Sequence, residues 1–118
     1  MTRYKITPVP KPRMTRRDKR LNPPRPGVAK YYALKDLVNL AHIELPRAGS
    51  SICFILPMPR SWSGVKKARM LGKAHEVRPD LSNLLKALED ALFTEDSHIW
   101  HYGELSKIWG IKGEIIIE

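Results

Sequence analysis

The sequence predicts a single α/β (α+β) domain in which helices pack on a mixed β-sheet, with the elements in the order β-α-β-α-β-β. Three observations predict this fold. The chain has 118 residues, enough for one hydrophobic core. Residues 51–57 are almost all apolar, which is typical of a strand covered on both faces. Residues 79–93 carry leucines at helical spacing, which indicates a helix with one buried face.

The first half of the chain contains a strand, a loop and a helix. Residues 3–7 alternate polar and apolar side chains and predict a short first strand. Residues 11–27 combine prolines, glycine and basic side chains without apolar periodicity, so we expect a long, basic and flexible loop. Apolar residues then recur at helical spacing and predict a helix over 28–43.

The second half supplies most of the sheet. Residues 51–57 predict a central strand, and a short helix over 66–71 follows with Ser61 as its cap. Pro79 is well placed to open the helix over 79–93. Two further strands close the chain, 98–109 and 111–117, turned near Gly110 and Gly113.

Charge is strongly segregated along the chain. The net charge is +9, and residues 1–30 account for all of it. Residues 60–78 carry +5, whereas residues 79–118 carry −5. Basic loops could serve only to keep the protein in solution, but such asymmetry is more typical of a protein with a polyanionic partner.

Cysteine and hydropathy patterns indicate the compartment. Cys53 stands alone in an apolar run, so no internal disulfide is expected and we interpret it as a small core residue. No apolar segment of the leader type follows the basic N-terminus, and the apolar run at 52–58 is too short to cross a bilayer. We therefore expect a cytoplasmic protein without a membrane partner.

Oxygen ligands for a divalent metal occur on the polar side of the helix over 79–93. Asp80 opens this helix, Asp90 lies further along it, and Asp96 follows in a turn. Carboxylates of this kind bind Mg²⁺ at phosphoryl-transfer sites, and Lys86 could neutralise developing charge. The spacing alone leaves a second interpretation open, in which these residues form an ordinary solvated face with a Lys86–Asp90 surface pair.

The same segment resembles a known signature. Residues 78–92 (RPDLSNLLKALEDAL) and 95–100 (EDSHIW) resemble the motif of the RusA-type Holliday junction resolvases, which are common in bacteriophages and prophages. The resemblance extends weakly over most of the chain. It implies a dimeric, Mg²⁺-dependent endonuclease, with Mn²⁺ as a substitute, that makes paired nicks in four-way DNA junctions inside a bacterial cell.

The resemblance also assigns roles to individual residues. Asp80 and Asp96 match metal ligands, Lys86 matches the catalytic lysine, and Asp90 matches a helix aspartate near the site. DNA contacts are implied by analogy for basic residues of the loop and of the 60–78 segment: Lys11, Arg13, Arg16, Arg17, Lys19, Arg20, Lys66, Lys67, Arg69 and Arg78.

One position departs from the signature. Ser82 stands where the signature has a second metal-binding aspartate, so the site lacks one negative charge. Three interpretations follow. Ser82 binds the metal through water while Asp90 or Glu95 supplies the charge, the protein binds junctions but cuts poorly or not at all, or the serine was introduced to trap an inactive form.

Aromatic residues and histidines carry weaker signals. Trp62 lies in a basic segment and could stack on unpaired bases. A third function, RNA or single-strand binding through Trp62 and the loop, has little support. Trp100 and Trp109 are expected in the core. The histidines are expected at the surface and show no zinc-site spacing: His75, His98 and His101.

Overall fold

The computed structural model describes residues 1–46, 48–93 and 97–118. Its strands are β1 (Thr2–Tyr4), β2 (Ser50–Pro57), β3 (Tyr102–Gly110) and β4 (Glu114–Ile117). Its α-helices are α1 (Pro26–Leu40), α2 (Gly64–Met70) and α3 (Leu81–Leu92), and a short 3₁₀ helix, η1 (Asp18–Arg20), precedes α1. The predicted small α+β fold is confirmed.

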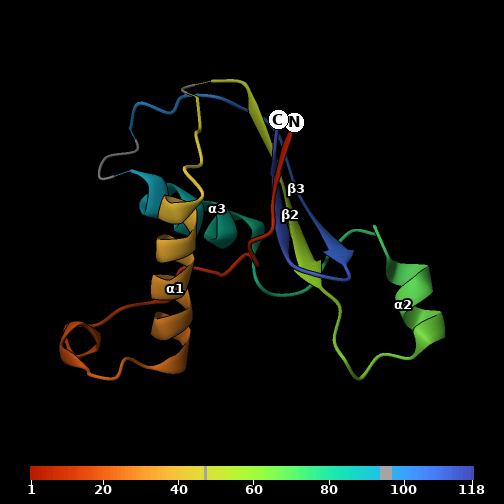
Figure 1. The fold of residues 1–118 in the computed structure, drawn as a ribbon, viewed down its shortest axis with the longest axis horizontal. Helices are drawn as coiled ribbons and strands as arrows, with labels where there is room; N and C mark the ends of the chain where they lie inside the picture. Colours follow the sequence, from red (N-terminus) through yellow and green to blue (C-terminus); the bar gives the residue numbers. More distant parts are fainter. Residues whose placement is uncertain (47, 94–96) are drawn as a thin grey trace.

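The strands form one mixed sheet in the order β1-β4-β2-β3. β2 runs parallel to β3 and antiparallel to β4, while β1 pairs antiparallel with β4 and brings the two termini together (Figure 1). β2 is therefore an inner strand, as predicted. The two closing strands, β3 and β4, do not pair with each other but lie on either side of β2. A parallel pair such as β2–β3 needs a long crossover connection, and α2 and α3 form that connection.

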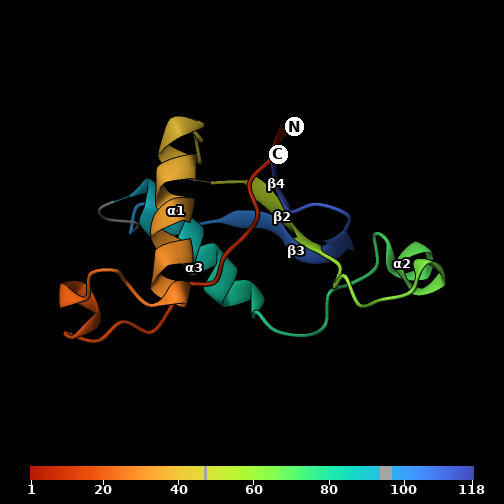
Figure 2. The same ribbon diagram turned by 60° about the horizontal axis from the view of Figure 1, so that its bottom comes forward.

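Helices α1 and α3 cover one face of the sheet, and α2 projects from its far end (Figure 2). Ile52 and Phe54 point from β2 toward these helices and are each 1% exposed. Ile55 and Cys53 point the other way, and Cys53 is only half-buried. Ile55 is itself 8% exposed, so the outer face of β2 is covered at Ile55 but only in part at Cys53, and Cys53 lies at the edge of the core rather than inside it.

The helices begin and end close to the predicted positions. α1 starts at Pro26, two residues early, because proline suits the first turn of a helix. The cap of α2 is Ser63, whose hydroxyl accepts a hydrogen bond from the Lys66 N–H at 3.2 Å, so the prediction of Ser61 as the cap is wrong. No helix among the described residues has the length and apolar composition needed to span a bilayer.

The largest boundary error concerns β3, which begins four residues later than predicted. The segment before it leaves the sheet, and the Nδ1 atom of His101 accepts a hydrogen bond from the Gly49 N–H at 3.1 Å. Trp100 consequently lies outside the core with 76% of its surface exposed, so its predicted burial is wrong. Trp109, further along β3, is 7% exposed, and its predicted burial is confirmed.

The turn between β3 and β4 depends on a glycine. A Cβ atom at Gly113 would lie 2.5 Å from the Cα atom of Thr7, so the backbone after β1 approaches too closely for a side chain. The predicted turn near Gly110 and Gly113 is confirmed, since β3 ends at Gly110 and β4 begins at Glu114.

We expect stability to depend on the contact of α3 with the rest of the core. Leu84 is 1% exposed, so Leu84→Ala should lower the free energy of unfolding by about 2–5 kcal/mol. Leu40→Ala is the matched control because Leu40 is 75% exposed, and it should change stability by less than about 0.5 kcal/mol. Urea denaturation measures both, and equal losses would contradict the assignment of the buried face.

Candidate functional site

Among the described residues, the carboxylate of Asp80 at the start of α3 has no hydrogen-bonding partner. Asp80 is the N-cap residue, and its backbone carbonyl accepts hydrogen bonds from the Asn83 and Leu84 N–H groups, both at 3.1 Å. Its side chain is exposed and makes no cap hydrogen bond. The carboxylate oxygens are therefore available to a cation.

Asp80 lies at a shallow hollow of about 490 Å³. The described residues that line it are Pro10, Arg78, Pro79, Asp80 and Asn83. Ser82 is exposed in the first turn of α3 and adds a hydroxyl oxygen near this end of the helix. Glu95 and Asp96, which were also predicted to contribute charge, lie outside the described residues.

Lys107 of β3 fixes the chain that leads into Asp80. Its Nζ atom donates hydrogen bonds to the carbonyl oxygens of Val77 and Pro79, both at 2.6 Å. It also lies 3.2 Å from the Nδ1 atom of His75. Sequence patterns did not identify Lys107, because a lysine within a strand resembles an ordinary surface residue until its acceptors are known.

His75 is part of the same anchor, and its predicted surface position is wrong. The side chain is 4% exposed, and its ring packs against Trp109 in a tilted arrangement with 4.1 Å between the centroids. Burial, together with the charge of Lys107, lowers the pKa of His75. The imidazole is therefore neutral near pH 7, as an acceptor for the ammonium group must be.

The other end of α3 holds a second polar cluster. Asp90 forms ion pairs with Lys11 of the loop and with Lys86, whose Nζ atom lies 3.3 Å from Oδ1 of Asp90. Burial acts to raise the pKa of Asp90, but the hydrogen bonds from Lys11 and Lys86 outweigh burial and hold this pKa below its usual value. Asp90 is thus an ionised partner of two lysines.

Asp80 and Asp90 are ten residues apart, which is about 15 Å along a helix. The structure therefore brings Asp90 together with Lys11 and Lys86, and it leaves Asp80 at the opposite end of α3 with Ser82 and Asn83. Among the described residues, no three acids, cysteines or histidines gather closely enough to hold a metal ion. The metal-ligand roles of Asp80, Ser82, Asp90 and Asp96 stay predictions.

An internal acid organises the basic loop. Asp18 is 4% exposed and forms an ion pair with Arg25, whose Nη2 atom donates to Oδ2 of Asp18 at 2.8 Å. The Thr15 N–H and hydroxyl also donate to Asp18, at 2.9 and 3.1 Å. These hydrogen bonds, with that of Arg25 the strongest, lower the pKa of Asp18 to about 2. The predicted flexibility of the loop stays a prediction.

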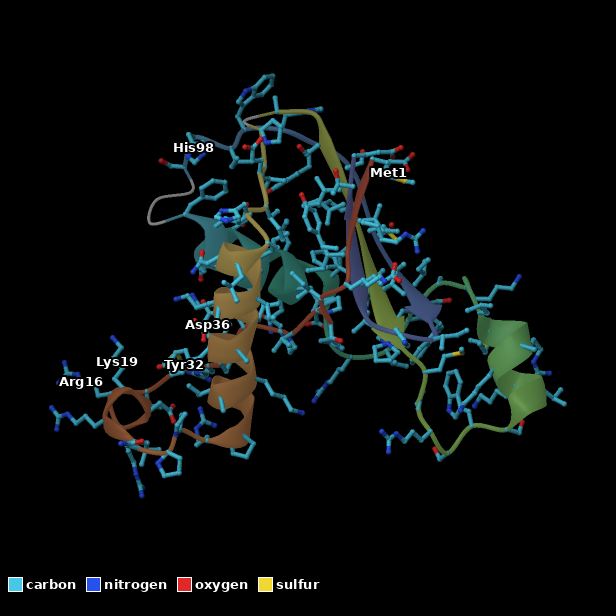
Figure 3. All side chains as sticks on the ribbon, viewed as in Figure 1. Met1, Arg16, Lys19, Tyr32, Asp36 and His98 are labelled. Atoms are coloured by element: carbon cyan, nitrogen blue, oxygen red, sulfur yellow. The ribbon has the colours of Figure 1, made fainter. Side chains whose placement is uncertain are left out.

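With Asp18 turned inward, the cations of this loop face solvent. Figure 3 shows Arg16 and Lys19 projecting from the end of the molecule around η1. Apart from Arg25, which pairs with Asp18, the exposed basic residues of the loop are Arg13, Arg16, Arg17, Lys19 and Arg20. They form what we call the η1 patch, a surface in which the one acid of the segment is already neutralised.

Helix α2 carries a second basic surface at the opposite end of the molecule (Figure 1). Trp62 packs against Trp109 in a tilted arrangement with 4.7 Å between the ring centroids, and the Nζ atom of Lys66 lies 4.3 Å from the ring centre of Trp62. Lys67 and Arg69 lie on the same helix. Helix α3, whose N-cap residue is Asp80, lies between this α2 patch and the η1 patch in Figure 1. The predicted DNA contacts of both patches stay predictions.

Comparison with protein families gives a match over nearly the whole chain. A family model described as endodeoxyribonuclease RusA matches residues 4–118. No curated protein and no solved structure matches the chain.

The Lys107 anchor can be tested by its effect on Asp80. Lys107→Met removes a donor that holds two carbonyl oxygens, so it should lower the free energy of unfolding by roughly 1–3 kcal/mol. It should also speed hydrogen exchange at the Asn83 and Leu84 amides, which bond to Asp80. Lys112→Met, at an exposed lysine of the neighbouring turn, is the control. Unchanged exchange in Lys107→Met would show that the anchor does not position Asp80.

The Asp18 pair can be tested by its pH dependence. The pKa of Asp18 is about 2 in the folded chain against 3.8 ordinarily, so the ionised carboxylate stabilises the fold above about pH 4 and this contribution is lost as the pH falls toward 2. Asp18→Asn should therefore be less stable than wild type at pH 7, and the difference should narrow below pH 4. Urea midpoints measure this, with Asp36→Asn as the control. A difference that does not change with pH would contradict the assignment.

Proposed function

The chain belongs to the RusA family of endodeoxyribonucleases, which implies Holliday junction resolvase activity, and we propose that it makes paired, Mg²⁺-dependent nicks in four-way junctions during DNA recombination and repair. One observation carries the proposal beyond the family. The carboxylate of Asp80 has no partner in the described chain, stands at the positive end of a helix, and lies between two basic patches. A free carboxylate in such surroundings is suited to hold a cation against a polyanion.

The donors near Asp80 fit magnesium in kind. Mg²⁺ prefers carboxylate and other hard oxygen ligands and keeps several of its waters, so few protein ligands suffice. We propose Asp80 and Asp96 as direct ligands and Ser82 as a ligand through water. When bound, the ion would lower the pKa of a water molecule and neutralise charge on the phosphate.

Lys86 would act on the phosphate rather than on the metal. It lies on the exposed side of α3, and its pairing with Asp90 restricts the direction of a long side chain. An ammonium group held in this way stabilises negative charge that develops in a phosphoryl transition state. Asp90 would then serve catalysis by positioning Lys86, which is a role that its two ion pairs support better than direct binding of the ion held by Asp80.

Paired nicks require two active sites related by two-fold symmetry, so we propose a homodimer. The outer face of the sheet offers a surface for a second copy. It carries a hollow of about 520 Å³ with Ile55, Ile108 and Ile116 in its lining, and the neighbouring Ile111 is 73% exposed. Helices α1 and α3 lie on the opposite face of the sheet (Figure 2), so burying this face against a second copy would remove apolar surface from water.

A second function is favoured by Ser82. A serine in place of an aspartate gives the site one negative charge fewer, which weakens its hold on metal while leaving the basic patches unchanged. The protein would then bind branched DNA and cut it poorly or not at all.

Junction cleavage decides between the two functions. A labelled four-way junction and a matched linear duplex are incubated with the protein, with and without Mg²⁺ or Mn²⁺. We expect cutting of the junction only with metal. We also expect Asp80→Asn and Asp96→Asn to abolish cutting while changing junction affinity less than about threefold, since neither substitution removes a lysine or arginine that pairs with phosphate.

Each contrary result has a separate meaning. Tight junction binding without any cut by the wild type would establish the binder, and cutting restored by Ser82→Asp would identify the serine as the cause. Loss of both cutting and binding in the two aspartate variants would mean that these acids maintain the fold. Equal affinity for junction and linear duplex would contradict junction recognition.

A further inference from the structure

A groove at the Asp90 end of α3 has no assigned role. It measures about 690 Å³ and is bounded by the basic loop, by α1 and by the end of α3. Helix α1 presents Tyr32, Lys35 and Asn39 to it, at positions i, i+3 and i+7 along one stripe of the helix. Sequence patterns identified α1 only as a core helix, so its groove-facing stripe was not predicted.

The polar groups that line the groove suit an anion. Lys11 and Lys19 enter from the loop and Lys35 from α1, so three cations reach it from two elements. Among the described lining residues the one acid is Asp90, and Asp90 already pairs with Lys11 and Lys86. The lining therefore keeps a positive charge after its internal pair is formed.

The ring of Tyr31 restricts Lys35, whose Nζ atom lies 5.3 Å from the ring centre. Tyr32, which is 39% exposed, contributes a hydroxyl donor to the lining, and Asn39 contributes an amide donor. In Figure 3, Lys19 on the loop and Tyr32 on α1 lie on the same side of the molecule. Lysine, tyrosine and asparagine side chains are common donors to DNA phosphates.

The position of the groove suggests which phosphates it would take. It lies at the Asp90 end of α3, about 15 Å from Asp80 by helix geometry. Phosphates on one DNA strand are about 3.4 Å apart along the duplex axis, so with α3 laid parallel to that axis the distance corresponds to about four phosphate steps. Lys86 lies on the polar face of α3 between Asp80 and Asp90, and Lys11 of the loop pairs with Asp90 on the same face.

We infer that this groove binds the DNA backbone about four phosphates from the scissile bond, through Lys19, Lys35, Tyr32 and Asn39. This inference rests on the proposed function. The groove would hold the strand in line with the cutting site and would read no bases, since its donors suit phosphate oxygens. A small organic ligand is disfavoured, because such ligands take mostly apolar pockets and this lining is mostly polar.

The test scans single methylphosphonate substitutions, which remove one phosphate charge each, along the cut strand of a four-way junction. For the wild type in Ca²⁺, we expect junction affinity to fall about three- to tenfold when the substitution lies three to five phosphates from the cut on one side. For Lys35→Ala and Tyr32→Phe, affinity should already be lower, and substitution at those phosphates should cause no further loss. Lys30→Ala, at an exposed lysine of α1 outside the groove, should keep the wild-type profile.

Two additional measurements support the scan. Lys35→Ala should reduce the slope of log affinity against log salt concentration by about 0.9. Asp36→Asn removes an exposed acid that Figure 3 places on the same side of α1 as Tyr32, so it should raise affinity. Circular dichroism of each variant separates loss of contact from loss of fold, and Tyr32→Phe retains the ring if Lys35→Ala proves unstable.

The possible outcomes distinguish a failure of the groove inference from a failure of the proposed function. Identical scans for the wild type and Lys35→Ala would overturn the inference even if the junction is cut. Groove-dependent binding of linear duplex and junction alike would support the groove while contradicting junction recognition, and absence of any DNA binding would overturn both. Inorganic phosphate should compete no better than chloride at equal ionic strength. Strong competition by free phosphate together with a flat scan would assign the groove to a free anion.

Discussion

The amphipathic character of α3 is the constraint on which the rest of the structure depends. Leu84, Ala87, Leu88 and Ala91 are buried between α1 and the sheet, and this burial fixes the rotation of the helix about its axis. The polar residues of the same helix must then face outward, from Asp80 at one end to Asp90 at the other. One face of this 12-residue helix thus packs in the core, and the opposite face carries the polar residues of the site.

Internal acids shape the basic surfaces of this protein. Asp18 neutralises Arg25 within the basic loop, and Asp90 pairs with Lys11 and Lys86 beside the groove. Each acid fixes a cation close to the fold and leaves neighbouring cations directed to solvent. A surface built in this way presents positive charge in a defined shape, which a polyanion binds at a smaller cost in side-chain entropy than a set of unrestrained lysines would require.

The sheet also contributes to the site through Lys107. Its ammonium group holds the carbonyls of Val77 and Pro79, so the position of Asp80 depends on β3 as well as on α3. Trp109 and His75 pack in the same region, and Trp62 packs against Trp109 beside α2. One end of the sheet therefore supports both the chain that leads into α3 and the base of the α2 patch. A change in the packing of this end would alter the positions of both Asp80 and Trp62.

The sequence by itself determined the order of the elements, the inner position of β2, the polar face of α3 and the family motif, because periodicity, turn residues and motif spacing are local properties. The tertiary structure decided what local patterns do not contain. Trp100 is exposed, against prediction, because β3 begins only at Tyr102, where β2 can pair with it. His75 is buried, against prediction, because its ring packs against Trp109 and lies beside Lys107. Lys107 and the α1 stripe gained their roles from acceptors and neighbours far away in the chain, and Asp90 was separated from Asp80 by the rise of the helix between them. Contacts between distant residues exist only once the chain has folded, and those contacts make the site.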